Sequence, residues 1–360
     1  MREWILPEKS HLGRKRVAMR YFLPVLAVVL LCCSSNSGSD MSKEAPQVER
    51  LPYAIAIHGG AGTILKENMS PEMEAAYLEA LETALSIGEG ILQNGGSSLD
   101  AVVQTIEYLE NSPLFNAGKG AVFTHEGRVE LDASIMDGAT RNAGAVGSLT
   151  IIKNPIKAAR AVLEHSPHVF LVGSGADRFA LEQGLDTVEN TYFHTERRWK
   201  SLQKALEKEG QSTGQLDPYA EPDHKYGTVG CVALDRAGNL AAGTSTGGTN
   251  NKRFGRIGDS PVIGAGTYAD NATCAVSCTG TGEYFIRFAV AHDVSARMAY
   301  RGESLSDAAQ GVIDELGKNG GDGGLIAVDR YGHISQPFNT AGMYRAYASP
   351  KERGLFIYQK

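Results

Sequence analysis

Two short patterns in the chain could place a nucleophile for acyl transfer. The first is GTSTG at Gly243–Gly247, which fits the G-x-S-x-G arrangement of a serine hydrolase, with His58-Gly59-Gly60 upstream as an oxyanion-type turn. That motif works only when the serine lies on a turn between a strand and a helix. The residues around and after it, GGTNNKRFGRIGDSP, contain four Gly, two Asn and one Pro, so they predict no helix. We therefore interpret this match as accidental.

The second pattern is the junction Gly227-Thr228, where a charged segment ends and an apolar strand begins. If the peptide bond before Thr228 breaks, one residue carries both a hydroxyl and a new α-amine. An α-amine has a pKa of ~7.7–8.0, so a good fraction is neutral near pH 7 and can take the hydroxyl proton. Gly227 has no Cβ and tolerates the strained geometry that such an attack requires. The residues alone do not separate this hypothesis from a plain loop-to-strand junction.

Nucleotide and metal chemistry have weaker signals. The chain has no G-x-x-x-x-G-K-[ST] pattern, and its Gly clusters lack the strand–turn–helix context of a dinucleotide fingerprint. Nine His are scattered without H-E-x-x-H or other ligand-like spacing. Asp132 and Asp137 lie close together in ELDASIMDG, where capping carboxylates of a turn explain them as well as an acid–base pair would.

The elements that must position these residues alternate irregularly. Ser70-Pro71 begins a helix that Gly95-Gly96 ends, and Ser97 followed by Asp100 begins a second one. Further helices are expected after Asn154-Pro155 and over Ala176–Gln183, Gly282–Tyr300 and Leu305–Leu316. Strands are expected in YAIAIHGGAG (running into a Gly-rich turn), VELDASIMDG, HVFLVG, TVGCVALD, LAAGTST and GLIAVDRYGHIS. This order is typical of an α+β chain of packed sheets and helices rather than a doubly wound parallel sheet.

Two stretches, residues 1–50 and residues 196–227, differ in composition from the rest of the chain. Arg14, Lys15, Arg16 and Arg20 precede the apolar run Tyr21–Cys33, which is the layout of a secretory signal over residues 1–33, with a polar linker over 34–50. LLCC resembles a bacterial lipobox with Cys33 or Cys32 lipidated, although an ordinary cleaved signal and a start at Met19 are alternatives. Residues 196–227 are charged and polar, and predict a frayed helix passing into a flexible segment.

Composition narrows the classes of partner. The net charge of -6, without a basic stripe, excludes nucleic acid as a favoured partner. Cys231, Cys274 and Cys278 are odd in number and lie in apolar segments, so we expect buried thiols rather than a disulfide framework or a zinc site.

Longer motifs link the junction to a family. YGTVGCVALDRAGNLAAGTSTGGTNNKRFGRIGDSPVIGAGTYADN and AVSCTGTGE closely resemble the plant-type asparaginase/isoaspartyl peptidase family of N-terminal nucleophile hydrolases. So do IAIHGGAG, LFNAGKGAVF, ELDASIMDG and PFNTAGMYRA, and the resemblance covers roughly Pro52 to Ala348. It implies a four-layer αββα sandwich that cleaves itself between Gly227 and Thr228 into an α subunit (51–227) and a β subunit (228–360), which together form one catalytic domain.

The resemblance also assigns roles to single residues. Thr246 matches the threonine that hydrogen-bonds the nucleophile Thr228. Arg256 and Asp259 match the residues that hold the α-carboxylate and α-amine of the substrate, a pairing that suits a guanidinium and a carboxylate. Thr279 and Gly280 match the oxyanion donors of the family. Gly282 and Asn116 match two further residues that contact the substrate.

A sodium ion is implied by the same resemblance, and no organic cofactor. Its ligands would be backbone carbonyls of Leu109, Glu110, Ser112, Phe115, Ala117 and Lys119. Lys119 departs from the family pattern, because it puts a cation where an uncharged residue is usual. A turn around Pro113 without an ion is the alternative.

The implied reaction is hydrolysis of the side-chain amide of asparagine or of the isopeptide bond in β-aspartyl dipeptides. Glycosylasparaginase is a related alternative, but it has Asp before the nucleophile, where this chain has Gly227. A surface lipoprotein that only binds amino acids is an alternative of another class. The resemblance and the N-terminal signal together imply an (αβ)2 dimer of processed chains, exported to the periplasm of a bacterium or anchored to a membrane by lipid.

Overall fold

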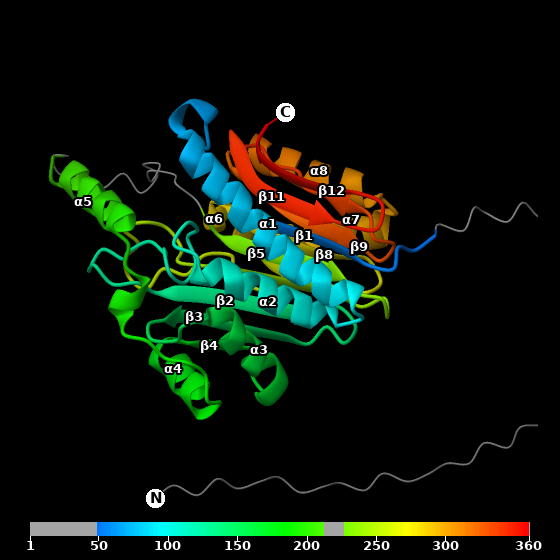
Figure 1. The fold of residues 1–360 in the computed structure, drawn as a ribbon, viewed down its shortest axis with the longest axis horizontal. Helices are drawn as coiled ribbons and strands as arrows, with labels where there is room; N and C mark the ends of the chain where they lie inside the picture. The colour runs from blue at the N-terminus through cyan, green and yellow to red at the C-terminus, as the bar shows by residue number, and fades with distance from the viewer. Residues whose placement is uncertain (1–48, 212–226, 360) are drawn as a thin grey trace, which may run out of the picture. The chain divides into compact units, whose positions relative to one another are not determined.

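A computed structural model describes residues 49–211 and 227–359 (Figure 1). The expected signal over 1–33, with Cys32 and Cys33, and nearly all of the expected linker over 34–50 lie outside the described residues, as do residues 212–226. Within the described ranges, no helix is long and apolar enough to cross a membrane.

The larger of two sheets has eight strands in the order β12-β11-β1-β5-β6-β2-β3-β4, and only the β3–β4 pair in it is parallel. Its strands are β1 (Ala54–Gly62), β2 (Leu131–Asp137), β3 (Ala143–Leu149), β4 (Phe170–Val172), β5 (Val229–Leu234), β6 (Leu240–Thr246), β11 (Gly342–Ala348) and β12 (Arg353–Tyr358). The smaller sheet has the order β10-β9-β8-β7. Its strands are β7 (Thr267–Ala269), β8 (Cys274–Gly280), β9 (Gly323–Asp329) and β10 (Ile334–Ser335).

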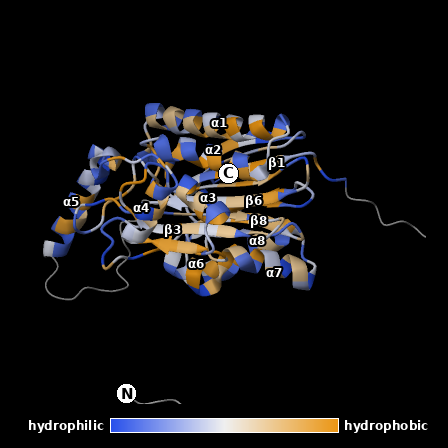
Figure 2. Ribbon diagram, turned by 90° about the horizontal axis from the view of Figure 1, so that it is seen from below, coloured by the Kyte–Doolittle hydropathy of each residue, from blue (hydrophilic) through white to orange (hydrophobic). Residues whose placement is uncertain are grey.

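Alternating side chains divide the interior into three cores. In β1, Ile55 and Ile57 belong to the core that the larger sheet forms with α1 (Pro71–Gln93), α2 (Ser98–Asn111) and α3 (Pro155–His165), while Ala54 and Ala56 face the smaller sheet. In β8, Val276 packs against α6 (Gly282–Phe288), α7 (Val290–Arg301) and α8 (Leu305–Lys318), and Ala275 faces the larger sheet. Figure 2 shows the sheets between these two groups of helices. The small residues between the sheets let them pack closely.

Local signals predicted most of the helices. Ser70 Oγ accepts the N–H of Met73 at the start of α1, and Ser97 Oγ accepts that of Asp100 at the start of α2, so both expected N-caps are confirmed. The strands expected in TVGCVALD and LAAGTST are present and pair as the hairpin β5–β6, and those in GLIAVDRYGHIS pair as β9–β10. The remaining helical elements are α4 (Gly173–Glu182), α5 (Glu196–Gln211) and the short 3-10 turns Lys66–Asn68 and Asn190–Phe193.

The HGGAG segment is not the turn that its glycines predicted. It continues β1 to Gly62, with a register shift between His58 and Gly60. Gly60 has a φ of +110°, and a Cβ there would lie 2.5 Å from Cα of Gly227. The glycines therefore serve a close approach of two backbones, a need that the local sequence does not reveal.

The expected helix Gly282–Tyr300 is also wrong in one respect, because it breaks into α6 and α7. Ala289 between them is left-handed, with a φ of 48°. The N–H groups of Ala291 and His292 donate to the carbonyls of Ala265 and Gly264. The loop before β7 thus anchors the start of α7, and a tertiary contact overrides the helical pattern.

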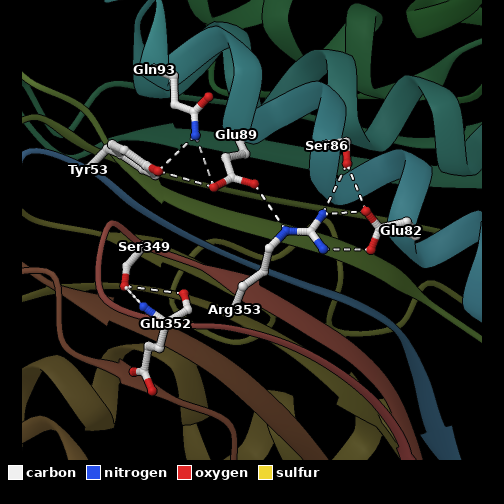
Figure 3. A network of polar contacts seen from close by, with 8 residues as sticks. All are labelled: Tyr53, Glu82, Ser86, Glu89, Gln93, Ser349, Glu352 and Arg353. Atoms are coloured by element: carbon white, nitrogen blue, oxygen red, sulfur yellow. Dashed lines mark hydrogen bonds and ion pairs between the residues drawn. The ribbon is translucent and has the colours of Figure 1, made fainter.

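An arginine on β12 fastens the edge of the larger sheet to α1 (Figure 3). Arg353 donates to both carboxylate oxygens of Glu82 at 2.6 Å and to Glu89 at 3.2 Å. The hydrogen bond from Arg353 lowers the pKa of Glu82. Since the guanidinium is about one-third exposed, this pair adds about 1 kcal/mol or less to stability. It does join the end of the chain to its first helix.

Candidate active site

Three polar side chains form a row across neighbouring strands of the larger sheet. Thr228 immediately precedes β5, its hydroxyl oxygen lies 3.0 Å from that of Thr246 at the end of β6, and Thr246 pairs in register with Asp132 on β2. Thr246 and Asp132 are buried and Thr228 is partly buried. The antiparallel hairpin β5–β6 therefore brings together two threonines that are 18 residues apart.

The environment of Thr246 determines what its hydroxyl can do. Thr246 Oγ1 accepts the N–H of Gly248 at 3.0 Å. Its own hydrogen can then point to Thr228 Oγ1, or one of its lone pairs can accept from Thr228. Either arrangement holds the Thr228 oxygen in a fixed position.

Gly227 is enclosed by backbone. Its carbonyl oxygen accepts the N–H of Asn116 at 2.9 Å. A Cβ at Gly227 would lie 2.7 Å from Cβ of Asn116 and 2.8 Å from its nitrogen, so no larger residue fits without displacement. The carbonyl beside Thr228 is thus immobilised and polarised by an N–H donor.

Asn116 connects three loops through its backbone and side chain. Its Nδ2 donates to the Gly248 carbonyl at 2.7 Å, its Oδ1 accepts the N–H of Val122 at 2.8 Å, and its carbonyl accepts the N–H of Gly247 at 3.0 Å. The side chain predicted to contact substrate is therefore engaged in holding the loops around Gly227.

Arg256 and Asp259 converge at the start of α6. A Cβ at Gly282 would lie 2.8 Å from Nη2 of Arg256 and 2.9 Å from Oδ1 of Asp259. Arg256 donates through Nε and Nη2 to both oxygens of Glu283, at 2.9 and 3.0 Å. This fork fixes the guanidinium and leaves Nη1, which lies near Gly248, as the group that can take a further carboxylate.

Asp259 is a buried carboxyl group prepared for a cation. Its Oδ2 has no hydrogen-bond partner among the described residues. Burial raises the pKa of Asp259 to about 7, while Arg256 lowers it and Glu283 and Asp132 raise it further. A ligand ammonium at Oδ2 would supply the missing partner.

Thr279 and Gly280 end β8, where Thr279 faces the larger sheet and a Cβ at Gly280 would point toward Phe285 of α6. Thr279 is buried and accepts the N–H of Ala61 at 3.3 Å, which leaves its own hydrogen available to a ligand. A Cβ at Gly280 would lie 2.3 Å from the carbonyl oxygen of Asp322. The predicted oxyanion donors therefore lie on a rigid strand end.

His58 contacts the backbone of Thr228. Nδ1 lies 3.1 Å from the carbonyl oxygen of Thr228, and since a carbonyl only accepts, Nδ1 carries the proton. In a neutral ring Nε2 then accepts from Ser277 Oγ, 3.0 Å away. Burial lowers the pKa of His58 to about 3, so the ring is neutral at physiological pH. Neither the sequence patterns nor the resemblance had assigned this role.

The serine of GTSTG points away from this site. Ser245 is buried, and its hydroxyl donates to Oε1 of Glu110 on α2 at 2.7 Å. Asn154 Nδ2 and the N–H of Ile156 donate to the same carboxyl group, which accordingly binds the start of α3. Burial raises the pKa of Glu110 to about 7. Ser245 has a structural partner and is not paired with His58.

The two aspartates of ELDASIMDG are separated by the strand between them. Asp132 accepts the N–H of Ser148 and lies 3.9 Å from Nζ of buried Lys252, while Asp137 caps a turn at Ala139. Five strand residues span about 16 Å, so they form no acid–base pair. Asp137 is the turn cap that was expected, and Asp132 is not. The three expected buried thiols are confirmed, because Cys231, Cys274 and Cys278 are free and buried.

The loop expected to bind sodium is tightly wound. The Glu110 carbonyl accepts the N–H of Lys119 at 2.7 Å, and the Leu109 carbonyl accepts that of Ser112 at 3.2 Å. A Cβ at Gly120 would lie 2.6 Å from the carbonyl oxygen of Pro113 and 2.8 Å from that of Phe115, so two carbonyls converge there. The Lys119 ammonium lies over the ring of Tyr192, 5.4 Å from its centroid. Of these two carbonyls, that of Phe115 belongs to the expected ligands and that of Pro113 does not.

Comparison with known proteins supplies an independent line of argument. A family profile described as asparaginase matches residues 51–357. The isoaspartyl peptidase of Escherichia coli is 51% identical over 297 residues, which cover 81% of this chain and 92% of the relative. A plant-type L-asparaginase of Pyrococcus abyssi is 42% identical over 306 residues (83% and 96%). The isoaspartyl peptidase/L-asparaginase of Rattus norvegicus is 41% identical over 312 residues (86% and 90%).

Proposed function

The chain belongs to the asparaginase family, and from this premise we propose that it is an isoaspartyl peptidase/L-asparaginase with Thr228 as its nucleophile. It hydrolyses β-aspartyl dipeptides and the side-chain amide of asparagine. The observation that carries this proposal is a chain of contacts from Thr228 to the two charged residues. The Thr228 hydroxyl lies 3.0 Å from that of Thr246, which accepts the N–H of Gly248. Arg256 Nη1 lies near Gly248, and Arg256 and Asp259 converge at Gly282. We also propose that its fold is the αββα sandwich of the N-terminal nucleophile hydrolases, because the chain belongs to this family.

Self-cleavage comes first in the proposed sequence. Thr228 Oγ attacks the carbonyl carbon of Gly227, and the bond from that carbon to the Thr228 nitrogen breaks, which leaves an ester and a free amine. Water then hydrolyses the ester to a Gly227 carboxylate and restores the Thr228 hydroxyl. The Asn116 N–H at 2.9 Å from the Gly227 oxygen supports this step, because it stabilises the oxyanion that forms there.

Hydrolysis of substrate repeats the attack at a new carbonyl. Arg256 Nη1 and Asp259 hold the α-carboxylate and α-ammonium, and these contacts place the side-chain carbonyl at Thr228 Oγ. The Thr228 amine accepts the hydroxyl proton and passes it to the departing ammonia or amino acid. Thr279 and Gly280 serve the oxyanion, and water releases aspartate from the acyl-enzyme.

Comparing self-cleavage and aspartate release in the wild type and in Thr228→Ala tests this proposal. Purified wild-type protein should separate into two fragments on denaturing electrophoresis, and Thr228→Ala should remain one chain. Aspartate release from a β-aspartyl dipeptide should accompany the cut. A wild type that stays uncut yet fully active would contradict the mechanism. Glycosylated asparagine as a parallel substrate would distinguish a glycosylasparaginase, and cleaved protein without any aspartate release would indicate a binding protein.

Three further properties belong to the proposal. The carbonyls of Leu109, Glu110, Ser112, Phe115, Ala117 and Lys119 would hold a structural sodium ion, a proposal that the membership in the asparaginase family supports. The N-terminal pattern supports export, with lipid on Cys32 or Cys33 as the membrane anchor. Processed chains would pair as an (αβ)2 dimer. Mass spectrometry of the mature protein reads the modified N-terminus, and light scattering reads the assembly.

A further inference from the structure

One cation near the cleavage junction has no role in the mechanism above. Arg198 on α5 is 6% exposed. Burial lowers its pKa to about 10, so it stays protonated at neutral pH. No ion pair with a carboxylate is present for it among residues 49–211 and 227–359. Burying a guanidinium without a neighbouring anion costs free energy, and an anion that forms beside it would offset this cost.

Its two ends have different neighbours. Nε donates to the carbonyl of Gly120 at 2.7 Å, a contact that holds the loop bearing Asn116. Nη2 lies 3.4 Å from the position that a Cβ on Gly227 would take. Since a Cβ lies about 2.5 Å from the carbonyl carbon of its own residue, Nη2 is within about 6 Å of the carbon that Thr228 attacks.

We infer that Arg198 serves the negative charge that self-cleavage develops on the Gly227 carbonyl group. The inference rests on the proposed function, since that charge exists only if Thr228 attacks Gly227. The Asn116 N–H meets the oxyanion directly, and the guanidinium of Arg198 adds a full positive charge behind it. When the ester is hydrolysed, the same cation faces the new Gly227 carboxylate, an anion of a kind that none of the described residues pairs with Arg198 before the cut.

Simple electrostatics sets the size of the effect. A unit charge at about 6 Å in an effective dielectric of about 20 changes a rate by about a hundredfold. A partly developed charge and some solvent screening reduce this, so we expect loss of the cation to slow self-cleavage at least tenfold.

Two substitutions separate the charge of Arg198 from its structural contact. Arg198→Gln puts an N–H donor where Nε lies, so it can keep the bond to Gly120 while it removes the charge. Arg198→Lys keeps the charge and loses that donor. Arg197→Gln is the matched control, because Arg197 is the neighbouring arginine of the same helix and donates instead to Leu114 and Tyr77.

The full chain, made by cell-free translation, would be followed as it converts to two fragments. We expect Arg197→Gln to cleave at the wild-type rate, Arg198→Lys within about threefold of it, and Arg198→Gln at least tenfold more slowly. Thermal melts of each product show that it is folded, and aspartate release per cleaved molecule should stay near the wild-type value. Rapid cleavage of Arg198→Gln would overturn the inference, as would slow Arg198→Lys beside normal Arg198→Gln, whereas an uncut wild type would instead refute the proposed function.

Discussion

His58 donates from Nδ1 to the carbonyl oxygen of Thr228 over 3.1 Å, so a neutral histidine holds the backbone of the proposed nucleophile. The folded-state pKa of about 3 lies below the ordinary value of 6.5. Below pH 6.5, His58 is protonated in the unfolded chain but stays neutral in the folded chain. Protonation therefore favours unfolding increasingly as the pH falls from 6.5 to 3. At pH 5 the cost is about 2 kcal/mol.

His58→Asn should remove this pH dependence, because an amide can donate to the same carbonyl and does not titrate. The difference in unfolding free energy between wild type and variant should narrow by about 2 kcal/mol between pH 7 and pH 5. Urea titrations at both pH values measure it. The comparison with the variant is needed because the raised pKa values of Asp259 and Glu110 make the folded state more stable as the pH falls, opposite to the effect of His58. This contribution is the same in both proteins and cancels in the difference. A constant difference would contradict a neutral, buried His58.

Asp259 should control how substrate affinity depends on pH. Its pKa of about 7 means that the carboxylate that binds an ammonium forms as the pH rises through 7. Neutralising the Thr228 amine, with a pKa of ~7.7–8.0, is a second requirement. The logarithm of kcat/KM should rise below pH 7 with a slope near two. Asp259→Asn should lower that slope to about one and raise KM by about tenfold to a hundredfold. Equal slopes would exclude Asp259 as the titrating group.

Ser245→Ala should distinguish the two nucleophile patterns in the sequence. It removes the 2.7 Å bond to Glu110, which costs about 1–2 kcal/mol of stability. Self-cleavage and aspartate release should stay within about twofold of wild type, in contrast to Thr228→Ala. A folded Ser245→Ala without activity would restore the serine-hydrolase interpretation.

Sodium should stabilise the Asn116 loop if the proposed cation site is present. Melting temperatures in NaCl and in choline chloride at equal ionic strength compare the specific ion with charge screening alone. We expect a higher Tm in NaCl, rising with its concentration as for any ligand of the folded state. Lys119→Met should leave this shift nearly unchanged, because the Lys119 ammonium lies over the ring of Tyr192 and the proposed ligand at this residue is its backbone carbonyl. Identical melting in the two salts would remove the site.

The elements that the sequence predicted well are those fixed by neighbouring residues. Ser70 and Ser97 cap helices whose first turns lie beside them in the chain. The elements that it missed depend on distant contacts. Ala289 breaks a helix because the loop at Gly264 binds the next turn, and HGGAG stays extended because Gly227 packs against Gly60.

The residues of the candidate site likewise fall into those that the sequence predicted and those that only the structure revealed. The long motifs identified Thr228, Thr246, Arg256 and Asp259 through a resemblance, while spacing alone left Thr228 at an ordinary junction. Arg198 lies in ERRWK, which is indistinguishable in sequence from a solvated helix, and only its burial beside Gly227 distinguishes it from Arg197. The role of His58 was missed because its side-chain partner, Ser277, is 219 residues away.

The strand order β11-β1-β5-β6-β2 interleaves the two segments on either side of Gly227. Once cut, the molecule would be a heterodimer whose subunits share one hydrogen-bonded sheet, and no docking of finished parts could rebuild it. The uncut chain would refold in a first-order process, whereas the denatured mature enzyme would need a bimolecular encounter. Its recovery from denaturant should therefore depend on protein concentration, whereas that of the uncut chain should not.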